Sequence, residues 1–259
     1  MDLGLSGRKA IICASSRGLG RGCAVALAEA GCGLVMNGRN PESLKQACDD
    51  IRQRTGAAVE MVVGDVSTIE VQKELLRTCP DADILINNNG GPPHRDLQAL
   101  DRQSIIDGVT QNMITPIELV QGVIDGMVER RFGRIVNITS SSVYMPIPGL
   151  NLSSGARAGL ASFLAGVARN VAGKNVTINS LLPGRMDTDR LAAGFANTSA
   201  RTDRSVEEVR AASIDQIPAR RLGTSEEFGN VCAFLCSQYA GYITGRNILV
   251  DGGLVPSAF

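Results

Sequence analysis

The feature that most constrains the fold is a short apolar segment that runs into a glycine-rich turn and then an alanine-rich segment. Residues 9–13 are mostly apolar, glycines stand at 18, 20 and 22, and residues 23–31 form an amphipathic stretch. This pattern is typical of a strand, a tight turn and a helix. The first amide groups of such a helix, together with its dipole, attract phosphate. The turn predicts a nucleotide site, with a mere tight connection as the alternative.

The rest of the chain alternates strand-like and helix-like segments. Strands are expected at 33–37, 57–63, 83–87, 133–139, 176–182 and 247–250, and helices at 41–54, 67–78, 101–130, 153–171 and 225–237. Repeated alternation of apolar strands with helices predicts a parallel sheet covered on both faces. We expect one α/β domain over residues 1–259, a doubly wound parallel sheet of about seven strands, without repeats.

Composition and charge argue against several kinds of partner. Lys plus Arg and Asp plus Glu balance at 26 each, so no overall field holds the protein to nucleic acid or an anionic membrane. The first residues lack a basic leader, and no segment offers about 18 uninterrupted apolar residues. A cytoplasmic protein is expected, with no nucleic-acid or membrane partner.

The cysteines do not form a recognisable pattern. There are seven, without a Cys-x-x-Cys pair, at 13, 23, 32, 48, 79, 232 and 236. Cys232 and Cys236 are one helical turn apart, but His94 is the only histidine, and a metal needs further ligands. We expect buried, unbonded cysteines, no disulfide and no metal site.

The predicted strands share one property at their carboxyl ends, which is where ligands bind in a parallel sheet. Six of these ends are polar, rich in glycine, or both: 14–20, 37–40, 64–66, 87–91, 139–142 and 183–188. Polar groups along a whole edge predict an extended dinucleotide together with a substrate.

Several motifs, in the right order, resemble those of the short-chain dehydrogenase/reductase family over essentially the whole chain. They are Ser16–Gly20, Asp65–Val66, Asn87–Gly90, Asn112, Ser140, Pro183–Gly184 with Thr188, Tyr242–Gly245 and Asp251–Gly253. Members labelled 3-oxoacyl-acyl-carrier-protein reductase are the most similar. The resemblance implies a Rossmann fold, NAD(H) or NADP(H), a small carbonyl or alcohol substrate, and a homotetramer or homodimer.

The resemblance also indicates which residues bind the cofactor. They are Ser15, Ser16, Arg17, Gly18, Leu19, Gly20, Arg39, Asp65, Val66, Asn88, Asn89, Gly90, Arg157, Pro183, Gly184, Met186 and Thr188. The second strand ends without an acid that would repel the additional phosphate of NADP(H), and Arg39 and Arg17 are candidates to bind it. We expect NADPH, with NADH as the alternative; two solvated arginines are the other interpretation.

The catalytic couple departs from the family pattern. Where the family has Tyr-x-x-x-Lys, this chain has Ser153 and Arg157, and the spacing from Ser140 matches the family's. The family's phenol protonates the substrate oxygen, whereas a serine hydroxyl is a far weaker acid without an adjacent base. Arginine keeps a positive charge and donors for the cofactor ribose. The expected catalytic residues are Ser140, Asn112, Ser153, Arg157 and Tyr144.

Three sources of the missing proton are open. Tyr144 lies in the loop 141–149, where it is either a relocated acid or part of a lid. His94 follows the fourth strand and either reaches the site or is solvated. A water held by Ser140 and Ser153 is the third source.

Other positions also differ from the family or vary in character. Ala14 replaces the first glycine of the turn, and we expect its methyl group to be tolerated. Asn89 replaces an alanine, with no role assigned. The resemblance makes 185–221 a substrate lid that controls access, in which Arg185 and Arg190 either meet an acidic substrate or are solvated. The small residues of 153–171 permit close packing, either across subunits or on the protein's own sheet.

The leading hypothesis is an NADPH-dependent oxidoreductase that reduces a carbonyl, possibly a 3-oxoacyl compound, or runs in reverse, with a non-standard proton donor. The alternative from another class is an NADP(H)-binding protein without hydride transfer, acting as a sensor or assembly partner. An epimerase or lyase that keeps the nucleotide for structure is a third. Turnover separates the first two, because both predict NADPH binding.

Overall fold

The computed structural model describes residues 2–92 and 94–257, and its centre is one sheet of parallel strands in the order β3-β2-β1-β4-β5-β6-β7. The strands are β1 (Lys9–Ile12), β2 (Gly33–Gly38), β3 (Val59–Val63), β4 (Ile84–Asn87), β5 (Gly133–Ile138), β6 (Val176–Pro183) and β7 (Asn247–Val250). Apolar runs without polar alternation suit strands that are covered on both faces. The doubly wound parallel sheet predicted from the alternation is confirmed.

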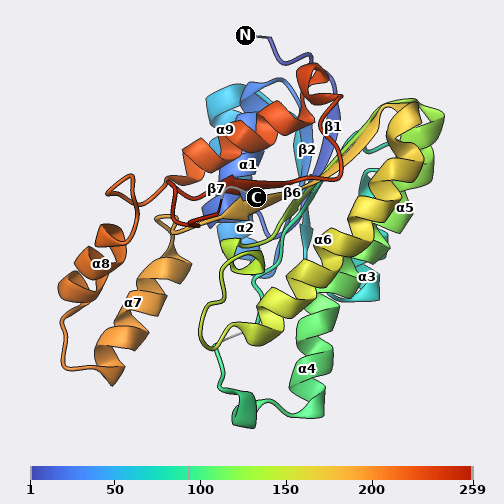
Figure 1. The fold of residues 1–259 in the computed structure, drawn as a ribbon. Coiled ribbons are helices and arrows are strands. Elements are labelled where there is room, and N and C mark those ends of the chain that lie inside the picture. Colours follow the sequence, from blue (N-terminus) through green and yellow to red (C-terminus); the bar gives the residue numbers. More distant parts are fainter. Residues whose placement is uncertain (1, 93, 258–259) are drawn as a thin grey trace.

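Helices cover both faces of this sheet (Figure 1). The helices are α1 (Gly18–Glu29), α2 (Pro41–Thr55), α3 (Ile69–Thr78), α4 (Arg102–Val109), α5 (Thr115–Glu129), α6 (Asn151–Val171), α7 (Asp189–Arg201), α8 (Val206–Asp215) and α9 (Ser225–Cys236). One core cluster lies under α1, α2 and α9, and a second lies under α3, α5 and α6. All seven cysteines are buried with free thiols, as expected for small apolar side chains.

The order in which strands are added to the sheet reverses between β1 and β4. Strands β2 and β3 lie on one side of β1, and β4 to β7 lie on the other. The carboxyl ends of β1 and β4 are joined by a hydrogen bond from Asn88 Nδ2 to the carbonyl of Ala14, at 3.1 Å. Ligands of doubly wound sheets bind at such a switch point.

The helical stretch predicted at 101–130 is interrupted. A wide turn, Thr110–Ile114, separates α4 from α5 and holds Asn112. Pro116 has no amide hydrogen, so it cannot donate to the carbonyl four residues earlier, that of Asn112, as an α-helix requires. Such π-turns are frequent at functional sites.

Helices α7 and α8 extend away from the sheet in Figure 1 and occupy most of the segment 185–221. Thr188 caps α7, and Ser205 with Glu208 forms a capping box at the start of α8. The pair has its own small core, made by Phe195, Val209, Ile217 and Leu222. Its apolar residues therefore pack on one another and on Leu254 after β7, in a cluster separate from the two that cover the sheet.

No helix in the described part of the chain is both long and apolar enough to cross a membrane.

Candidate active site

The turn between β1 and α1 is shaped for close approach. Ala14 and Gly18 have φ of +45° and +56°, and a β-carbon on Gly20 would lie 2.4 Å from the carbonyl oxygen of Ala14. Only glycine fits at position 20, which confirms the tight packing expected of this turn. Ala14 is accommodated, although its φ is one that alanine disfavours. The first amides of α1 face the carboxyl edge of the sheet, where a phosphate group would be stabilised.

The other predicted cofactor residues lie along the same edge. Thr188 is 3.7 Å from the position of a β-carbon on Gly18, so the start of α7 borders the turn. Gly184 permits β6 to approach Asp251 closely, because a β-carbon on Gly184 would lie only 2.6 Å from Asp251 Cβ. Asp65 accepts a hydrogen bond from the amide of Ser67, at 2.9 Å. Val66 and Met186 are buried, Leu19 and Pro183 are half-buried, and Gly90 is open.

Ser15 differs from its neighbours in the turn because it is fully buried. Its hydroxyl donates to the carbonyl of Ile12 at 2.9 Å and accepts from the amide of Asn37 at 3.2 Å. Its side chain is therefore used to join the ends of β1 and β2.

The end of β2 carries positive charge and no acid. Arg39 is exposed, Ser16 lies 3.3 Å from the position of a β-carbon on Gly38, and residues 37–40 include no carboxylate. Arg17 is also exposed, and it pairs at 3.5 Å with Asp189 at the start of α7. These residues fit the additional phosphate of NADP(H), because they offer cations where an acid would repel it.

Arg157 occupies the centre of the edge and is only 8% exposed. It donates from Nε to Ser153 Oγ at 3.1 Å, from Nη1 to the carbonyl of Ile138 at 2.6 Å, and from Nη2 to the carbonyl of Asn89 at 3.4 Å. Burial, and then the charge of Arg190, lower the pKa of Arg157 to about 10. The group is still protonated at neutral pH.

The two serines have different environments. Ser153, buried on α6, accepts a hydrogen bond from Arg157 and so positions the guanidinium. Ser140 follows β5 and is half-buried; its Oγ accepts from the amide of Ser142 at 3.1 Å. The hydroxyl hydrogen of Ser140 remains available for a ligand.

Buried polar atoms without a hydrogen-bond partner gather around this edge. Among the described residues they are Asn87 Oδ1, Asn112 Oδ1, Thr115 Oγ1, Thr139 Oγ1, Ser142 Oγ and Ser154 Oγ. They come from the ends of β4 and β5, the helical turn after β5, the wide turn, and the starts of α5 and α6. Buried polar atoms are normally paired, so their concentration in one place points to a ligand or ordered water there.

A small cavity lies beside Asn112 and Arg157, lined also by Asn88, Asn89 and Gln111, with a volume of about 10 Å³. This is room for about one water molecule. The water would have Asn112 Oδ1, which otherwise lacks a donor, as a partner.

Asn89 has a structural role that its position in the sequence did not indicate. Its Nδ2 donates to Ser67 Oγ at 3.1 Å and to the carbonyl of Gln111 at 3.3 Å. Its Oδ1 accepts from the amide of Gly90, and its carbonyl accepts from Arg157. Asn89 thus fastens the end of β4 to the wide turn and to Arg157.

The remaining candidates lie in two loops that touch one another. Tyr144 is 43% exposed, and within the described part of the chain its hydroxyl has no hydrogen-bond partner. His94 is exposed and lies 3.5 Å from the position of a β-carbon on Gly149. The donors of Arg185 are used outside the site: they bind the carbonyl of Ser213 and Gln216 Oε1, at the other end of the segment 185–221.

A doubly wound parallel sheet with a phosphate-binding turn at its switch point defines a Rossmann-type, dinucleotide-binding protein. Residues 13–255 match the family model described as "Enoyl-(Acyl carrier protein) reductase". The chain belongs to the short-chain dehydrogenase/reductase family, as the motifs predicted.

Two relatives illustrate the similarity in sequence. The 3-oxoacyl-[acyl-carrier-protein] reductase FabG of Aquifex aeolicus is 33% identical over 98% of this chain and 100% of its own length. The NADPH-dependent reductase BacG of Bacillus subtilis is 29% identical over 98% of this chain and 100% of its own length.

Solved structures have the same fold. L-sorbose reductase from Gluconobacter frateurii, complexed with NADPH and L-sorbose, superposes with a TM-score of 0.94 at 26% identity, covering 99% of this chain and 100% of its own. YwfH, an NADPH-dependent reductase involved in bacilysin biosynthesis, gives 0.91 at 28% identity, covering 97% and 100%.

Proposed function

We propose that the protein is an NADPH-dependent reductase of a small carbonyl compound, 3-oxoacyl compounds included, which also runs in reverse as a dehydrogenase. The observation that carries this proposal is the placement of a phosphate-binding turn and a buried arginine on one edge of the sheet. The NADPH-dependent relatives support the cofactor, and the cations Arg17 and Arg39 support the preference over NADH.

When bound, NADPH supplies the hydride. The chain's own contribution is to stabilise charge on the substrate oxygen, which becomes negative as the carbonyl is reduced. Ser140 donates its hydroxyl hydrogen to that oxygen, and Arg157 provides a fixed positive charge with unused N–H donors. Ser153 and Asn89 hold Arg157 in place.

The proton that completes the alcohol needs a source other than residue 153. Ser153 already accepts from Arg157, and a serine hydroxyl is a weak acid. Tyr144 and His94 are both exposed, so each can exchange protons with solvent, and the cavity beside Asn112 has room for a water. We infer that the proton comes from solvent through Tyr144 or this water.

The experiment is the absorbance of NADPH over time with β-keto thioesters, quinones and sugar-derived ketones. Oxidation that survives Ser153→Ala but collapses in Ser140→Ala supports the proposal. Collapse in Tyr144→Phe as well assigns the proton to Tyr144. Tight NADPH binding without turnover of any carbonyl favours the alternative, a cofactor-binding sensor or assembly partner.

The assembly proposed with this function is a homotetramer or homodimer in the cytoplasm. Ile114 and Phe163 are 41% and 48% exposed on the α5–α6 side, and Gly155 and Gly166 of α6 face open space. Gly159, in contrast, packs on Met113 Sδ within the same chain. Light scattering of the purified protein measures the assembly, and a monomer at micromolar concentration contradicts it.

A further inference from the structure

The guanidinium groups of Arg157 and Arg190 both lie beside Gly91. The position of a β-carbon on Gly91 lies 3.3 Å from Arg157 Nη2 and 3.5 Å from Arg190 Nη2. Asp189, the acid next to Arg190, pairs instead with Arg17. Neither Arg157 nor Arg190 has an ion pair within residues 2–92 and 94–257. Like charges repel, so this arrangement costs free energy unless an anion joins it.

Arg157 is also incompletely bonded. A guanidinium has five N–H donors, and this one makes three hydrogen bonds within the described residues, all to neutral oxygens. The donors left over belong to Nη1 and Nη2. A buried cation is normally paired with an anion, so the missing partner is expected from a ligand.

Arg190 comes from the other side of the site. It lies in the first turn of α7, and within the described residues its side chain makes no hydrogen bond. The residue as a whole is exposed, while the protein around its guanidinium lowers the pKa of that group through burial. Arg185 differs, because α8 and the turn after it already occupy its donors. Of these two arginines, Arg190 is therefore the one free to bind an anion.

We propose that Arg157 and Arg190 together bind the carboxylate of the substrate, which makes the substrate a small oxo acid. This rests on the function proposed above. A carboxylate presents two coplanar oxygens that match pairs of guanidinium N–H groups. In a 2-oxo acid the carbonyl oxygen lies beside the carboxylate, so Arg157 can face both. Asn112 Oδ1, also 3.3 Å from the same point, is an acceptor and suits the neighbouring water instead.

The position of Arg190 on α7 links this anion to the segment 185–221. A carboxylate held between Arg157 and Arg190 joins α6 to α7 across the entrance of the site. Binding of the acid then holds α7 over the reacting carbonyl, as a closing lid does.

The test uses pyruvate, acetoacetate and levulinate, each beside its methyl ester, with NADPH oxidation as the readout. We expect kcat/KM for at least one acid to exceed that of its ester by about tenfold or more. Arg190→Gln should bring the ratio close to one, while Arg201→Gln, which removes the same charge from the exposed far end of α7, should preserve it. Equal use of acids and esters overturns the proposal.

A binding measurement separates this proposal from the proposed function. The melting temperature of the NADP⁺ complex is measured with each acid and ester, and acids should raise it in the unmodified protein but not in Arg190→Gln. If no carbonyl is turned over, the proposed function fails, and this melting experiment decides for or against the carboxylate site. Weaker NADPH binding in Arg190→Gln with an unchanged acid preference overturns the proposal and assigns Arg190 to the cofactor's phosphates.

Discussion

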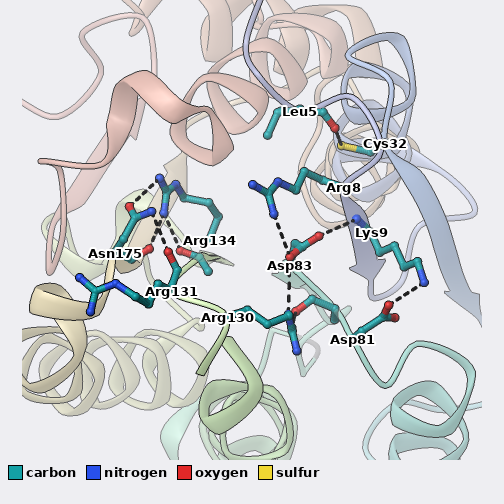
Figure 2. A network of polar contacts seen from close by, with 12 residues as sticks. Leu5, Arg8, Lys9, Cys32, Asp81, Asp83, Arg130, Arg131, Arg134 and Asn175 are labelled. Carbon is teal, nitrogen blue, oxygen red and sulfur yellow. Dashed lines mark hydrogen bonds and ion pairs between the residues drawn. The ribbon is translucent and has the colours of Figure 1, made fainter. Parts of the chain in front are cut away.

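The two edges of the sheet each contain a buried arginine without an acidic partner, yet the arginines are bonded differently. At the amino edge Arg134, only 1% exposed, donates to the carbonyls of Gly133 and Ser237. It donates as well to the carbonyl and Oδ1 of Asn175 (Figure 2). It also lies 4.4 Å from the centre of the Phe132 ring. At the carboxyl edge Arg157 has fewer bonds, a second cation nearby and unpaired polar atoms around it.

Burial lowers the pKa of both arginines, so burial alone does not distinguish them. What distinguishes them is how completely the protein satisfies their donors. At the amino edge the charged groups pair with one another: Asp83 contacts Arg8 and Arg130, and Lys9 pairs with Asp81 (Figure 2). The carboxyl edge leaves donors and acceptors for molecules that come from solution.

The largest expected effect tests the carboxyl edge. Arg157→Met should lower kcat/KM for the best substrate by about 100-fold or more, because the charge facing the substrate oxygen is lost. The free energy of unfolding should change less than in the amino-edge variant below, because removing a buried unpaired cation offsets the loss of the donors to the carbonyls of Ile138 and Asn89. NADPH oxidation and urea denaturation measure the two quantities. A fall in stability without loss of turnover would remove the distinction between the edges.

The matching change at the amino edge should act in the opposite way. Arg134→Met leaves the buried carbonyls of Gly133 and Ser237 without this donor and should lower the free energy of unfolding by about 3 kcal/mol. Turnover well below the melting temperature should be unchanged, because the residue lies at the edge remote from the site. Urea denaturation with parallel kinetics is the measurement, and loss of turnover in a stable variant would contradict the assignment.

A third arginine sharpens the comparison because it is at the ligand edge but exposed. Arg39→Ala should raise the Kd for NADPH by about tenfold, by removing a cation from the additional phosphate. The Kd for NADH serves as the internal control and should not move. Fluorescence titration of the reduced cofactors gives both constants. An equal change in both would mean that Arg39 acts on something other than that phosphate.

The smallest effect concerns backbone strain. Ala14→Gly should raise the free energy of unfolding by about 1 kcal/mol, because glycine adopts a φ of +45° without strain. Arg131 at the amino edge has a φ of +54°, and Arg131→Gly should give a similar gain. Thermal denaturation of the two variants compares them. If only one variant gains stability, then backbone strain differs between the two edges, as the number of unpaired polar groups does.

The predictions from sequence succeeded where the determining contacts are local. The turn at 14–20 and the polar strand ends follow from glycine conformation and apolar runs, which neighbouring residues fix. Thr188 and the pair Ser205 and Glu208 are visible cap signals for α7 and α8, but the apolar residues behind them are sparse. The sequence alone does not predict α7 and α8, because these two helices pack mainly on each other and their apolar periodicity is weak.

The parts that escaped prediction depend on residues far apart in the chain. Arg157 on α6 and Arg190 on α7 are separated in the chain by β6 and come near each other only in the folded structure. Asn89 follows β4, yet its side chain binds Ser67 before α3 and Gln111 in the wide turn. Arg185 and Arg190 look equivalent in sequence, and only tertiary contacts show that α8 has engaged one of them. The burial of Arg134 inside β5 was equally invisible, because its acceptors come from three segments.

The wide turn at 110–114 also restricts how this chain can change in length. Each residue of a helix turns its successor by about 100°, so deleting one residue here would rotate α4 against α5 by that angle. Gly108 would then leave its place against Leu152, where a β-carbon would lie only 2.5 Å from Cδ2, and its carbonyl would no longer hold the amide of Asn112. Substitutions in this segment are local events, whereas an insertion or deletion would dismantle one wall of the site.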